Sequence, residues 1–353
     1  MKKVLIINLG KEYGGAETLI RNIIHHIDEV EVLLCVDKNG QFYNKDLRFK
    51  NNILICSTKN IHYISSIFKI IKYVKNNKID VIHTHGTPSN IVGIICKLVC
   101  KCKFIVTIHS DLDYDFSGNK LKIYKIVEKM TCRFSDQIVT VSKDLSNKLS
   151  LRNIKNEINI IHNGIKANVT SIERKTKNVF TFLFVGRLSE VKNIELLLDG
   201  MNYLKTKLYS FECFIVGDGE QKERLMEITD NYGLVDCVHF VGFKDDVSSY
   251  MKKADLLLVT SRMEGIPLVI IEAFANKLPV LASRVGGIKE IITDELNGIL
   301  FDVNNPSEFY QKLEEIIKEQ KNLNMVRENA YEDYCEKWNI ECMIQKYILL
   351  YKQ

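Results

Sequence analysis

Short, continuous apolar runs recur along the chain, and longer segments with apolar residues three or four apart separate many of them. The short runs are typical of parallel strands buried on both faces, and the longer segments of amphipathic helices. Seven strands are predicted in the first half: Lys3–Asn8, Val30–Val36, Asn52–Cys56, Val81–His83, Phe104–His109, Gln137–Val141 and Ile158–Ile161. Six are predicted in the second half: Thr181–Val185, Phe211–Val216, Cys237–Val241, Asp255–Thr260, Pro279–Ala282 and Ile299–Phe301.

Helices are predicted between several of these strands. They are Glu17–His26, His62–Lys78, Ser89–Val99, Asn193–Leu204, Gln221–Asn231 and Pro306–Lys321, with a last amphipathic helix around Trp338–Tyr351. Alternating strands and helices indicate the α/β class, here as two doubly wound Rossmann-like domains facing across a cleft. We predict a first domain over residues 1–166, a polar linker over 167–178, a second domain over 179–335 and a final helix over 336–353.

Composition is that of a globular enzyme. The 353 residues suit two domains, and 46% hydrophobic with 26% charged residues is ordinary for globular chains. The apolar run Val4–Leu9 is too short for a signal peptide, and no run approaches the roughly 20 residues of a membrane-spanning helix. Ten scattered cysteines are typical of reduced thiols in the cytoplasm. Cys96, Cys100 and Cys102 lack a fourth ligand at zinc spacing, so no metal is assigned.

Charge is divided unevenly between the two halves. Residues 1–170 hold 26 Lys and Arg against 15 Asp and Glu, whereas residues 171–353 hold 23 against 29, so the net charge of +5 hides a basic first half. In His62–Lys78, lysines alternate with apolar residues at helical spacing. Two interpretations stay open: a solvated surface helix, or a helix resting on an anionic membrane. No nucleic-acid-binding motif is present.

The segment from Asp255 to Gly298 carries the strongest chemical pattern. An apolar strand is followed by a loop with Glu264 and Gly265, by Pro267 at a predicted helix start, and by Glu272 inside the helix. Open α/β sheets bind ligands at the carboxyl edge, and helix N–H groups there bind phosphate. Glu272 lies roughly 8 Å along the helix from Pro267. Two carboxylates flanking one anion site suit a diphosphate with a hydroxyl-bearing ring at each end, such as a nucleotide sugar.

Other candidates lie after predicted strands. Arg187 and Lys192 can neutralise a departing diphosphate, although surface salt bridges are the alternative. Backbone N–H groups of Leu268 and Val269 face the same edge as Gly265. Glycines at two further turns permit close approach of a ligand, and an aromatic residue after a predicted strand could contact the nucleotide base; these residues are Gly15, Gly217 and Phe243.

Several short motifs resemble those of the retaining, two-Rossmann-domain (GT-B) glycosyltransferases of family 4. They follow one another along nearly the whole chain. They are Gly14-Gly15-Ala16-Glu17, Thr107-Ile108-His109, Val141-Ser142-Lys143, His162-Asn163-Gly164-Ile165, Val185-Gly186-Arg187 through Asn193, Val216-Gly217-Asp218-Gly219, and the Glu-x7-Glu pair of Glu264 and Glu272. In this fold the final helix crosses back onto the first domain, and we expect the same here.

The resemblance also implies roles. Arg187 and Lys192 would contact the donor phosphates, and His109 the donor sugar, although a structural histidine is the alternative. For Glu272 the carboxylate chemistry favours the ribose hydroxyls. Glu264 would touch the transferred sugar; its alternative is a helix-capping acid. Asp111-x-Asp113 looks like a metal-binding pair, but this fold generally works without a divalent metal.

We therefore expect a metal-independent retaining hexosyltransferase without a cofactor. Its partners would be a nucleotide sugar and a saccharide or lipid-linked acceptor, in bacterial cell-surface polysaccharide synthesis. The basic first half would hold it to the inner face of the cytoplasmic membrane. Two other functions stay open: a nucleotide-sugar epimerase on the same fold, and a non-catalytic nucleotide-sugar-binding subunit.

Overall fold

The computed structural model describes residues 1–11, 14–45, 53–59, 61–152, 154, 156–166, 179–244, 246–318 and 323–353. The chain divides into two compact units. Unit 1 comprises Met1–Gly164 and Ile340–Gln353, and unit 2 comprises Ile165–Asn339. The linker predicted over 167–178 lies outside the described residues.

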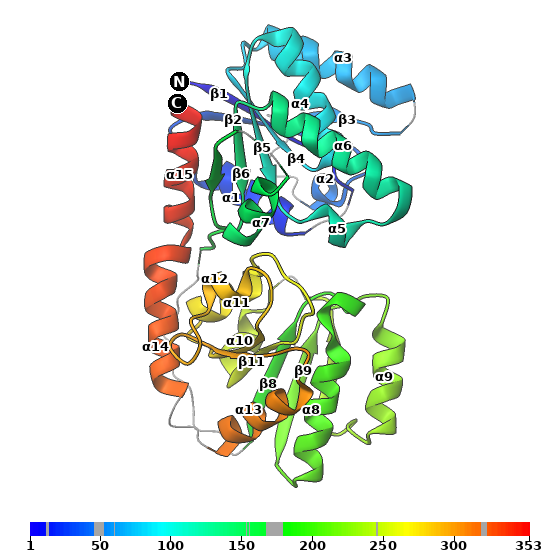
Figure 1. Cartoon of the computed structure of the whole chain (residues 1–353), viewed down its shortest axis with the longest axis vertical. Coiled ribbons are helices and arrows are strands. Elements are labelled where there is room, and N and C mark those ends of the chain that lie inside the picture. The colour runs from blue at the N-terminus through cyan, green and yellow to red at the C-terminus, as the bar shows by residue number, and fades with distance from the viewer. Residues whose placement is uncertain are drawn as a thin grey trace. The chain divides into compact units, whose positions relative to one another are not determined.

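Unit 1 is built on a parallel sheet of seven strands in the order β3-β2-β1-β4-β5-β6-β7 (Figure 1). The strands are β1 (Lys3–Asn8), β2 (Glu31–Asp37), β3 (Ile53–Cys56), β4 (Val81–His85), β5 (Lys103–Ile108), β6 (Gln137–Thr140) and β7 (Ile158–Ile160). Because every pair is parallel, all carboxyl ends lie along one edge.

Helices cover both faces of this sheet. The helices of unit 1 are α1 (Gly15–His26), α2 (Gln41–Lys45), α3 (Ile61–Asn76), α4 (Thr87–Cys100), α5 (Leu112–Asp115), α6 (Gly118–Phe134), α7 (Lys143–Ser150) and α15 (Ile340–Lys352). Successive strand residues point to opposite faces. Leu5 and Ile7 therefore pack with α3, α4, α6 and α7, whereas Val4 and Ile6 pack with α1 and α15. The last helix thus completes the core of unit 1.

Unit 2 has a parallel sheet of six strands in the order β10-β9-β8-β11-β12-β13. The strands are β8 (Phe180–Val185), β9 (Phe211–Val216), β10 (Val238–Gly242), β11 (Leu256–Val259), β12 (Val280–Ser283) and β13 (Ile299–Phe301). The chain reverses its winding between β8 and β11, which are neighbours in the sheet although β9 and β10 come between them in sequence. This is the position at which open α/β sheets bind ligands.

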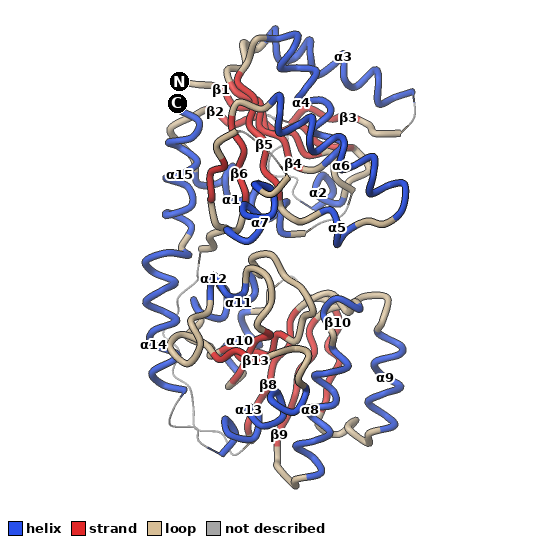
Figure 2. Tube along the Cα trace, viewed as in Figure 1, coloured by secondary structure: helices blue, strands red, loops and turns tan. Residues whose placement is uncertain are grey.

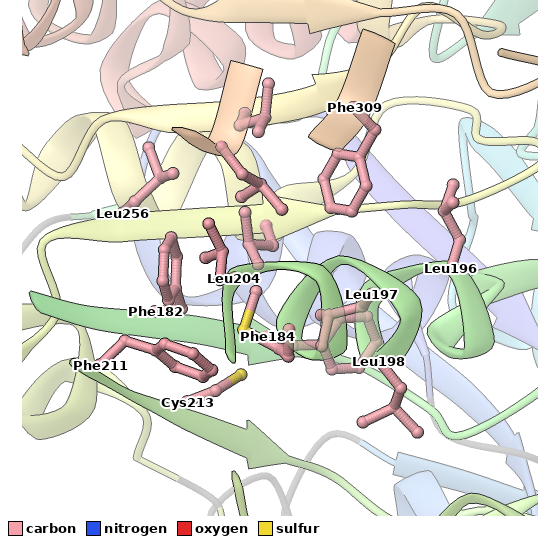
Figure 3. Close-up of a cluster of buried hydrophobic side chains, with 14 of the residues drawn as sticks. Phe182, Phe184, Leu196, Leu197, Leu198, Leu204, Phe211, Cys213, Leu256 and Phe309 are labelled. Carbon is pink, nitrogen blue, oxygen red and sulfur yellow. The ribbon is translucent and has the colours of Figure 1, made fainter. Parts of the chain in front are cut away.

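The helices of unit 2 also form two layers. They are α8 (Ile194–Thr206), α9 (Lys222–Asn231), α10 (Ser248–Lys253), α11 (Leu268–Ala275), α12 (Ile288–Ile291), α13 (Pro306–Lys318) and α14 (Leu323–Asp333), with a 3-10 turn η2 (Glu190–Lys192) and a π-helical turn η3 (Tyr334–Trp338). Helices α8 and α13 bury Leu197 and Phe309 against Phe182 and Phe184 of β8 (Figure 3). Helices α11 and α12 cover the opposite face.

The α/β fold with two doubly wound domains is confirmed, whereas several predicted boundaries are wrong (Figure 2). Strand β4 continues to His85, and His109 lies just beyond β5. Pro267 precedes α11 in an extended conformation instead of opening it. Helices α6, α7, α10, α12 and α14 were not predicted individually. In the part of the chain that is described, no helix is long and apolar enough to cross a membrane.

Candidate functional site

Two loops meet at the carboxyl edge of the sheet in unit 2. The loop after β8 leads through η2, and the loop after β11 leads to α11. Backbone contacts tie them together: Thr260 Oγ1 donates to Lys192 O at 3.0 Å, and Arg262 N donates to Val191 O at 2.8 Å. Both predicted elements of the site, from distant parts of the sequence, are thereby held side by side.

A half-buried ion pair joins the two loops. Lys192 Nζ contacts Glu264 Oε1, and Ser261 Oγ donates to the same oxygen at 2.7 Å. Glu264 Oε2 has no partner among the described residues. The carboxylate of Glu264 binds Lys192 and Ser261, and α11 has no side-chain hydrogen bond at its N-cap. Lys192 thus forms the ion pair that the salt-bridge alternative predicts, and its partner is the candidate residue Glu264.

The glycine pair after β12 fixes the loop that carries Glu264. Gly286 has a φ of +46°, and a Cβ there would lie 2.0 Å from Glu264 O. Gly287 N donates to that same carbonyl at 3.1 Å. Only glycine permits this crossing of two backbones. The Gly286-Gly287 turn thus positions Glu264 and needs no contact with a ligand to explain it.

Gly217 occupies a second crossing. Its φ is +147°, and a Cβ there would lie 1.8 Å from Gly186 O. Gly217 N donates to Gly242 O at 3.0 Å. The turn after β9 is therefore pressed against the turn after β8, which leads to Arg187. Gly217 is required by the fold itself, and any contact with a ligand would be additional.

Glu272 lies within α11, the helix that follows the loop of Glu264. Leu268 and Val269 open the helix, where the first N–H groups have no acceptor one turn earlier. Glu272 is half-buried, and burial raises the pKa of its carboxyl. Among the described residues this carboxylate has no hydrogen-bond partner. Desolvation without a partner is costly for a carboxylate, so its position is suited to an external donor.

The remaining candidates of unit 2 are exposed. Arg187 follows Gly186 after the end of β8, Gly265 lies between Glu264 and α11, and Phe243 follows β10 with 59% of its surface exposed. Exposure leaves Gly265 and Phe243 accessible to a ligand from solvent.

In unit 1, the turn that contains Gly15 is held by a buried polar network. Asn8 Nδ2 donates to Glu17 Oε1 at 2.8 Å, and Gly14 N donates to Glu17 Oε2 at 2.8 Å. Gly15 itself is exposed, and a Cβ there would meet nothing within 4 Å. The start of α1 is therefore held by these bonds while Gly15 is exposed, which is compatible with close approach of a ligand.

His109 lies at the edge of unit 1 beside a second histidine. His85 Nδ1 and His109 Nε2 are 2.8 Å apart, and the rings of His85 and His83 lie with centroids 4.3 Å apart and planes tilted by 45°. Burial lowers the pKa of His109 to about 4 and that of His83 to about 3. All three rings are therefore neutral near pH 7.

Asp111 and Asp113 are engaged by cations of the chain itself. Arg152 Nη2 donates to Asp111 Oδ1 at 2.5 Å and to Asp113 Oδ2 at 3.0 Å, and Arg152 Nη1 donates to Glu128 Oε1 at 2.6 Å. Lys125 also pairs with Asp113. Within the described residues no group of three His, Cys, Asp or Glu side chains could hold a metal ion, and all ten cysteines are free thiols.

Sequence reasoning missed two supporting residues, Ser261 and His85. Ser261 stands three residues before Glu264, a spacing that allows a local side-chain bond, and its carbonyl accepts from Ser283 Oγ at 2.6 Å. His85 forms a His-x-His pattern with His83. That alternation places both rings on one face of a strand, and it is the sequence pattern from which a role of His85 could have been predicted.

Both units are doubly wound, and unit 2 carries cations, a helix start and an unpartnered carboxylate at its switch point. This is the architecture of a GT-B protein. Comparison with solved structures agrees. The crystal structure of Anabaena HepE in complex with UDP-glucose covers 100% of both chains with a TM-score of 0.84 at 20% identity. At that identity the likeness establishes the fold.

Family profiles give a closer assignment. Residues 166–333 match glycosyl transferases group 1, and residues 13–169 match glycosyltransferase family 4. An uncharacterised glycosyltransferase of Methanocaldococcus jannaschii is 30% identical over 94% of this chain and 92% of that protein. An Escherichia coli UDP-Gal:α-D-GlcNAc-diphosphoundecaprenol α-1,3-galactosyltransferase is 27% identical over 82% of this chain and 79% of its own. The chain belongs to the group 1, family 4 glycosyltransferases.

Proposed function

We propose that this glycosyltransferase moves a hexose from a nucleotide sugar to a saccharide or lipid-linked saccharide, with retention of configuration. The observation that carries the proposal is the Lys192–Glu264 pair beside the start of α11 and the unpartnered Glu272, all within unit 2. Together they offer positive charge for a diphosphate and carboxylate oxygens for hydroxyl groups. The Anabaena protein of the same fold was crystallised with UDP-glucose, which supports a nucleotide-sugar donor.

Each residue has a role in this proposal. Arg187, Lys192 and the N–H groups of Leu268 and Val269 bind the diphosphate. Glu272 accepts hydrogen bonds from the ribose hydroxyls, and its lack of a partner supports this role.

The other contacts of the proposal concern the base and the sugar. Phe243 stacks on the base, while Gly265, Gly217 and Gly15 allow close backbone approach. Glu264 uses Oε2 to accept from a hydroxyl of the transferred sugar. His109 contacts that sugar, an assignment based on the family resemblance.

The chemistry follows from the charges. As the bond from the anomeric carbon to phosphate lengthens, negative charge grows on the diphosphate and positive charge on the sugar. Arg187, Lys192 and the helix start stabilise the former. Ser261 and Glu264 hold the ammonium of Lys192 in place before the reaction, which reduces reorganisation. The acceptor hydroxyl attacks from the same face, and the leaving phosphate oxygen takes its proton.

A panel of radiolabelled nucleotide sugars, incubated with the protein without acceptor, tests this proposal. Slow hydrolysis of one donor supports a transferase and identifies that donor. Isomerisation of the sugar would instead support the epimerase, and binding without turnover would support a non-catalytic subunit. NMR of the product made with acceptor then reports whether the anomeric configuration is retained.

We propose that the transfer needs no metal or other cofactor. Asp111 and Asp113, which resemble a metal-binding pair, are neutralised by Arg152 and Lys125, and this supports the proposal. Activity should be unchanged in chelator. Loss of activity in chelator with recovery in magnesium or manganese would contradict it.

A lipid-linked acceptor would bring the protein to the inner face of the cytoplasmic membrane, where we propose that it docks peripherally. One face of unit 1 supports this. Helix α4 contacts both α3 and α6, and these three helices cover the same side of the sheet (Figure 1). They expose large apolar side chains: Ile64, Phe68, Leu98, Val99, Ile123, Ile126 and Met130. Exposed lysines of α3, such as Lys72 and Lys75, lie on the same layer.

Apolar side chains beside lysines are suited to an anionic lipid surface, where each lysine contributes about 1 kcal/mol and salt screens the attraction. The Escherichia coli relative acts on a diphosphoundecaprenol-linked sugar, which supports a membrane-bound acceptor. The protein should sediment with anionic vesicles at low salt and be released at high salt. Equal binding to neutral and anionic vesicles would contradict the electrostatic part of the proposal.

Variants test whether this face of unit 1 or the net charge of the protein determines binding to vesicles. Replacing Lys69, Lys72, Lys75 and Lys78 with Gln should release the protein from anionic vesicles. A control with the same change in net charge replaces four lysines of unit 2 and should still bind; these are Lys207, Lys222, Lys244 and Lys289. Equal loss in both would show that net charge, and not this face, determines binding.

A further inference from the structure

His85, which contacts His109, differs from the buried His83 in having one ring nitrogen without a hydrogen-bond partner among the described residues. Strand β4 pairs with β5 so that His85 is opposite Thr107, which places His109 two residues further along the same face. His85 is 1% exposed, and its Nδ1 lies 2.8 Å from His109 Nε2. The other ring nitrogen of His85, Nε2, is buried without a hydrogen-bond partner in the described part of the chain.

His83 is different. Its Nδ1 lies 2.7 Å from the hydroxyl of Tyr351, and its Nε2 lies 2.7 Å from Thr107 Oγ1. Both nitrogens are therefore satisfied by groups of the core, and one partner belongs to the last helix. His83 is a structural histidine, whereas the only bond of His85 among the described residues goes to a candidate site residue.

The unpartnered nitrogen determines which ring donates. Two neutral imidazoles share one hydrogen, so one ring donates and the other accepts. If His85 Nδ1 accepted, the hydrogen of His85 would sit on Nε2 as a buried N–H without an acceptor. Buried N–H groups without acceptors are rare in native proteins. The alternative leaves His85 Nε2 as a bare nitrogen and makes His85 Nδ1–H the donor.

This arrangement also fixes the hydrogen of His109. Because its Nε2 accepts, the neutral ring carries its hydrogen on Nδ1, which has no partner within the described residues. We propose that His85 is a positioning residue that holds His109 as a neutral hydrogen-bond donor, with Nδ1–H directed to an oxygen of the transferred sugar. The inference deepens the proposed function and rests on it, since a contact of His109 with that sugar gives the tautomer its consequence.

A neutral donor suits the proposed reaction. Positive charge develops on the sugar during transfer, and an imidazolium next to it would oppose that charge. A neutral N–H group orients a sugar oxygen without this repulsion. The role of His85 is therefore to fix the orientation and the tautomer of the ring that touches the substrate, as the outer partner of a metal-bound histidine does in metal sites.

Two variants of nearly equal shape isolate the hydrogen bond. His85→Asn keeps an amide N–H that can replace Nδ1–H, whereas His85→Leu keeps the size of asparagine but has no donor. A third variant, Tyr351→Phe, is a control, because it removes one hydrogen bond from the same buried network without changing His85. Stability, kcat and KM for the accepted nucleotide sugar are measured for all three.

We expect His85→Leu to lower kcat about tenfold with a small change in KM, because a misplaced contact affects the transition state most. His85→Asn should recover most of this loss, and Tyr351→Phe should lower stability with kcat near that of the parent protein. Equal kcat in the Asn and Leu variants, or an equal loss in Tyr351→Phe, would overturn the proposal in favour of a purely structural role.

A second measurement does not depend on activity. In protein labelled with ¹⁵N-histidine, ring nitrogen shifts should show His109 protonated at Nδ1 and bare at Nε2 at pH 7, and a mixture of tautomers in His85→Leu. A hydrogen on His109 Nε2 in the parent protein would overturn the proposal. If the tautomer is as expected but no nucleotide sugar is turned over, the proposed function fails and the positioning of His109 stands.

Discussion

The two sheet edges of this protein are built from the same winding but hold their polar groups differently. In unit 2 the edge carries charge: Lys192 and Glu264 form a half-buried pair, and Glu272 has no partner in the described structure. In unit 1 the central edge is neutral: His85 pairs with His109, and His83 bonds to the hydroxyl groups of Thr107 and Tyr351.

The difference shows that a doubly wound fold does not determine the electrostatics of its edge. The strands bring loops together, and the loop residues decide between charged and neutral chemistry. A charged edge and a neutral edge can therefore arise on the same α/β architecture.

The largest effect should come from removing the cations of the charged edge. Arg187→Ala and Lys192→Ala should each lower kcat about 10²-fold, the usual scale for a lost contact to transition-state charge. Steady-state rates with the accepted donor measure this. Lys277→Ala is the matched control, because Lys277 pairs with Glu328 between the end of α11 and the start of β12, at the opposite end of the strands, and should leave the rate unchanged. Normal activity of both site variants would remove the proposed phosphate contact.

Replacing Glu272 should mainly weaken donor binding, whereas replacing Glu264 should mainly lower the rate. Glu272→Gln should raise the KM for the donor roughly tenfold or more, since hydrogen bonds to a charged group contribute about 1.5–3 kcal/mol. It should not lower the melting temperature, because the carboxylate lacks a partner. Glu264→Gln should mainly lower kcat, and it should lower the melting temperature because Lys192 loses its ion pair. If Glu272→Gln destabilises unit 2 without changing donor affinity, Glu272 is structural.

Acid should lower the stability of unit 1 more than that of unit 2. Burial lowers the pKa of His83 to about 3 and of His109 to about 4, so between about pH 6.5 and 4 the unfolded chain binds more protons and unit 1 loses stability as pH falls. Each histidine contributes a slope of roughly 1.4 kcal/mol per pH unit. Burial raises the pKa of Glu272, so its contribution to unit 2 has the opposite sign.

Calorimetry as a function of pH checks this prediction. The transition of unit 1 should move to lower temperature ahead of that of unit 2. His62→Gln changes an exposed histidine and is the control, since it should leave the pH profile unaltered. A profile in which unit 2 is lost first would contradict the assignment of acid sensitivity to the buried histidines.

The smallest effect on the fold should come from Gly15→Ala. A Cβ there meets nothing within 4 Å, and alanine in place of glycine in a helix gains about 0.5–1 kcal/mol. Stability should therefore rise slightly, while activity falls if a ligand approaches this backbone. Unchanged donor and acceptor kinetics in this variant would make the turn merely structural.

Much of the fold was predictable, because buried parallel strands are recognisable as apolar runs. The side-chain pairs of the site were not. Lys192 and Glu264 are 72 residues apart, and their contact depends on the path of two loops. Asp111 and Arg152 are 41 residues apart, and that pairing changed the meaning of Asp111-x-Asp113. His85 was assigned to no role because β4 was predicted to end at His83, two residues too early.

The return of α15 to unit 1 has a consequence for the synthesis of this protein on the ribosome. Tyr347 and Tyr351 are fully buried in the core of unit 1, yet the whole of unit 2 is translated before them. Until residues 340–353 emerge, Val4, Ile6 and their face of the first sheet lack α15 and are covered by α1. Unit 2, whose segments are contiguous, can complete its core first. Unit 1 therefore completes its core only after unit 2 has been synthesised, although most of its residues are made first.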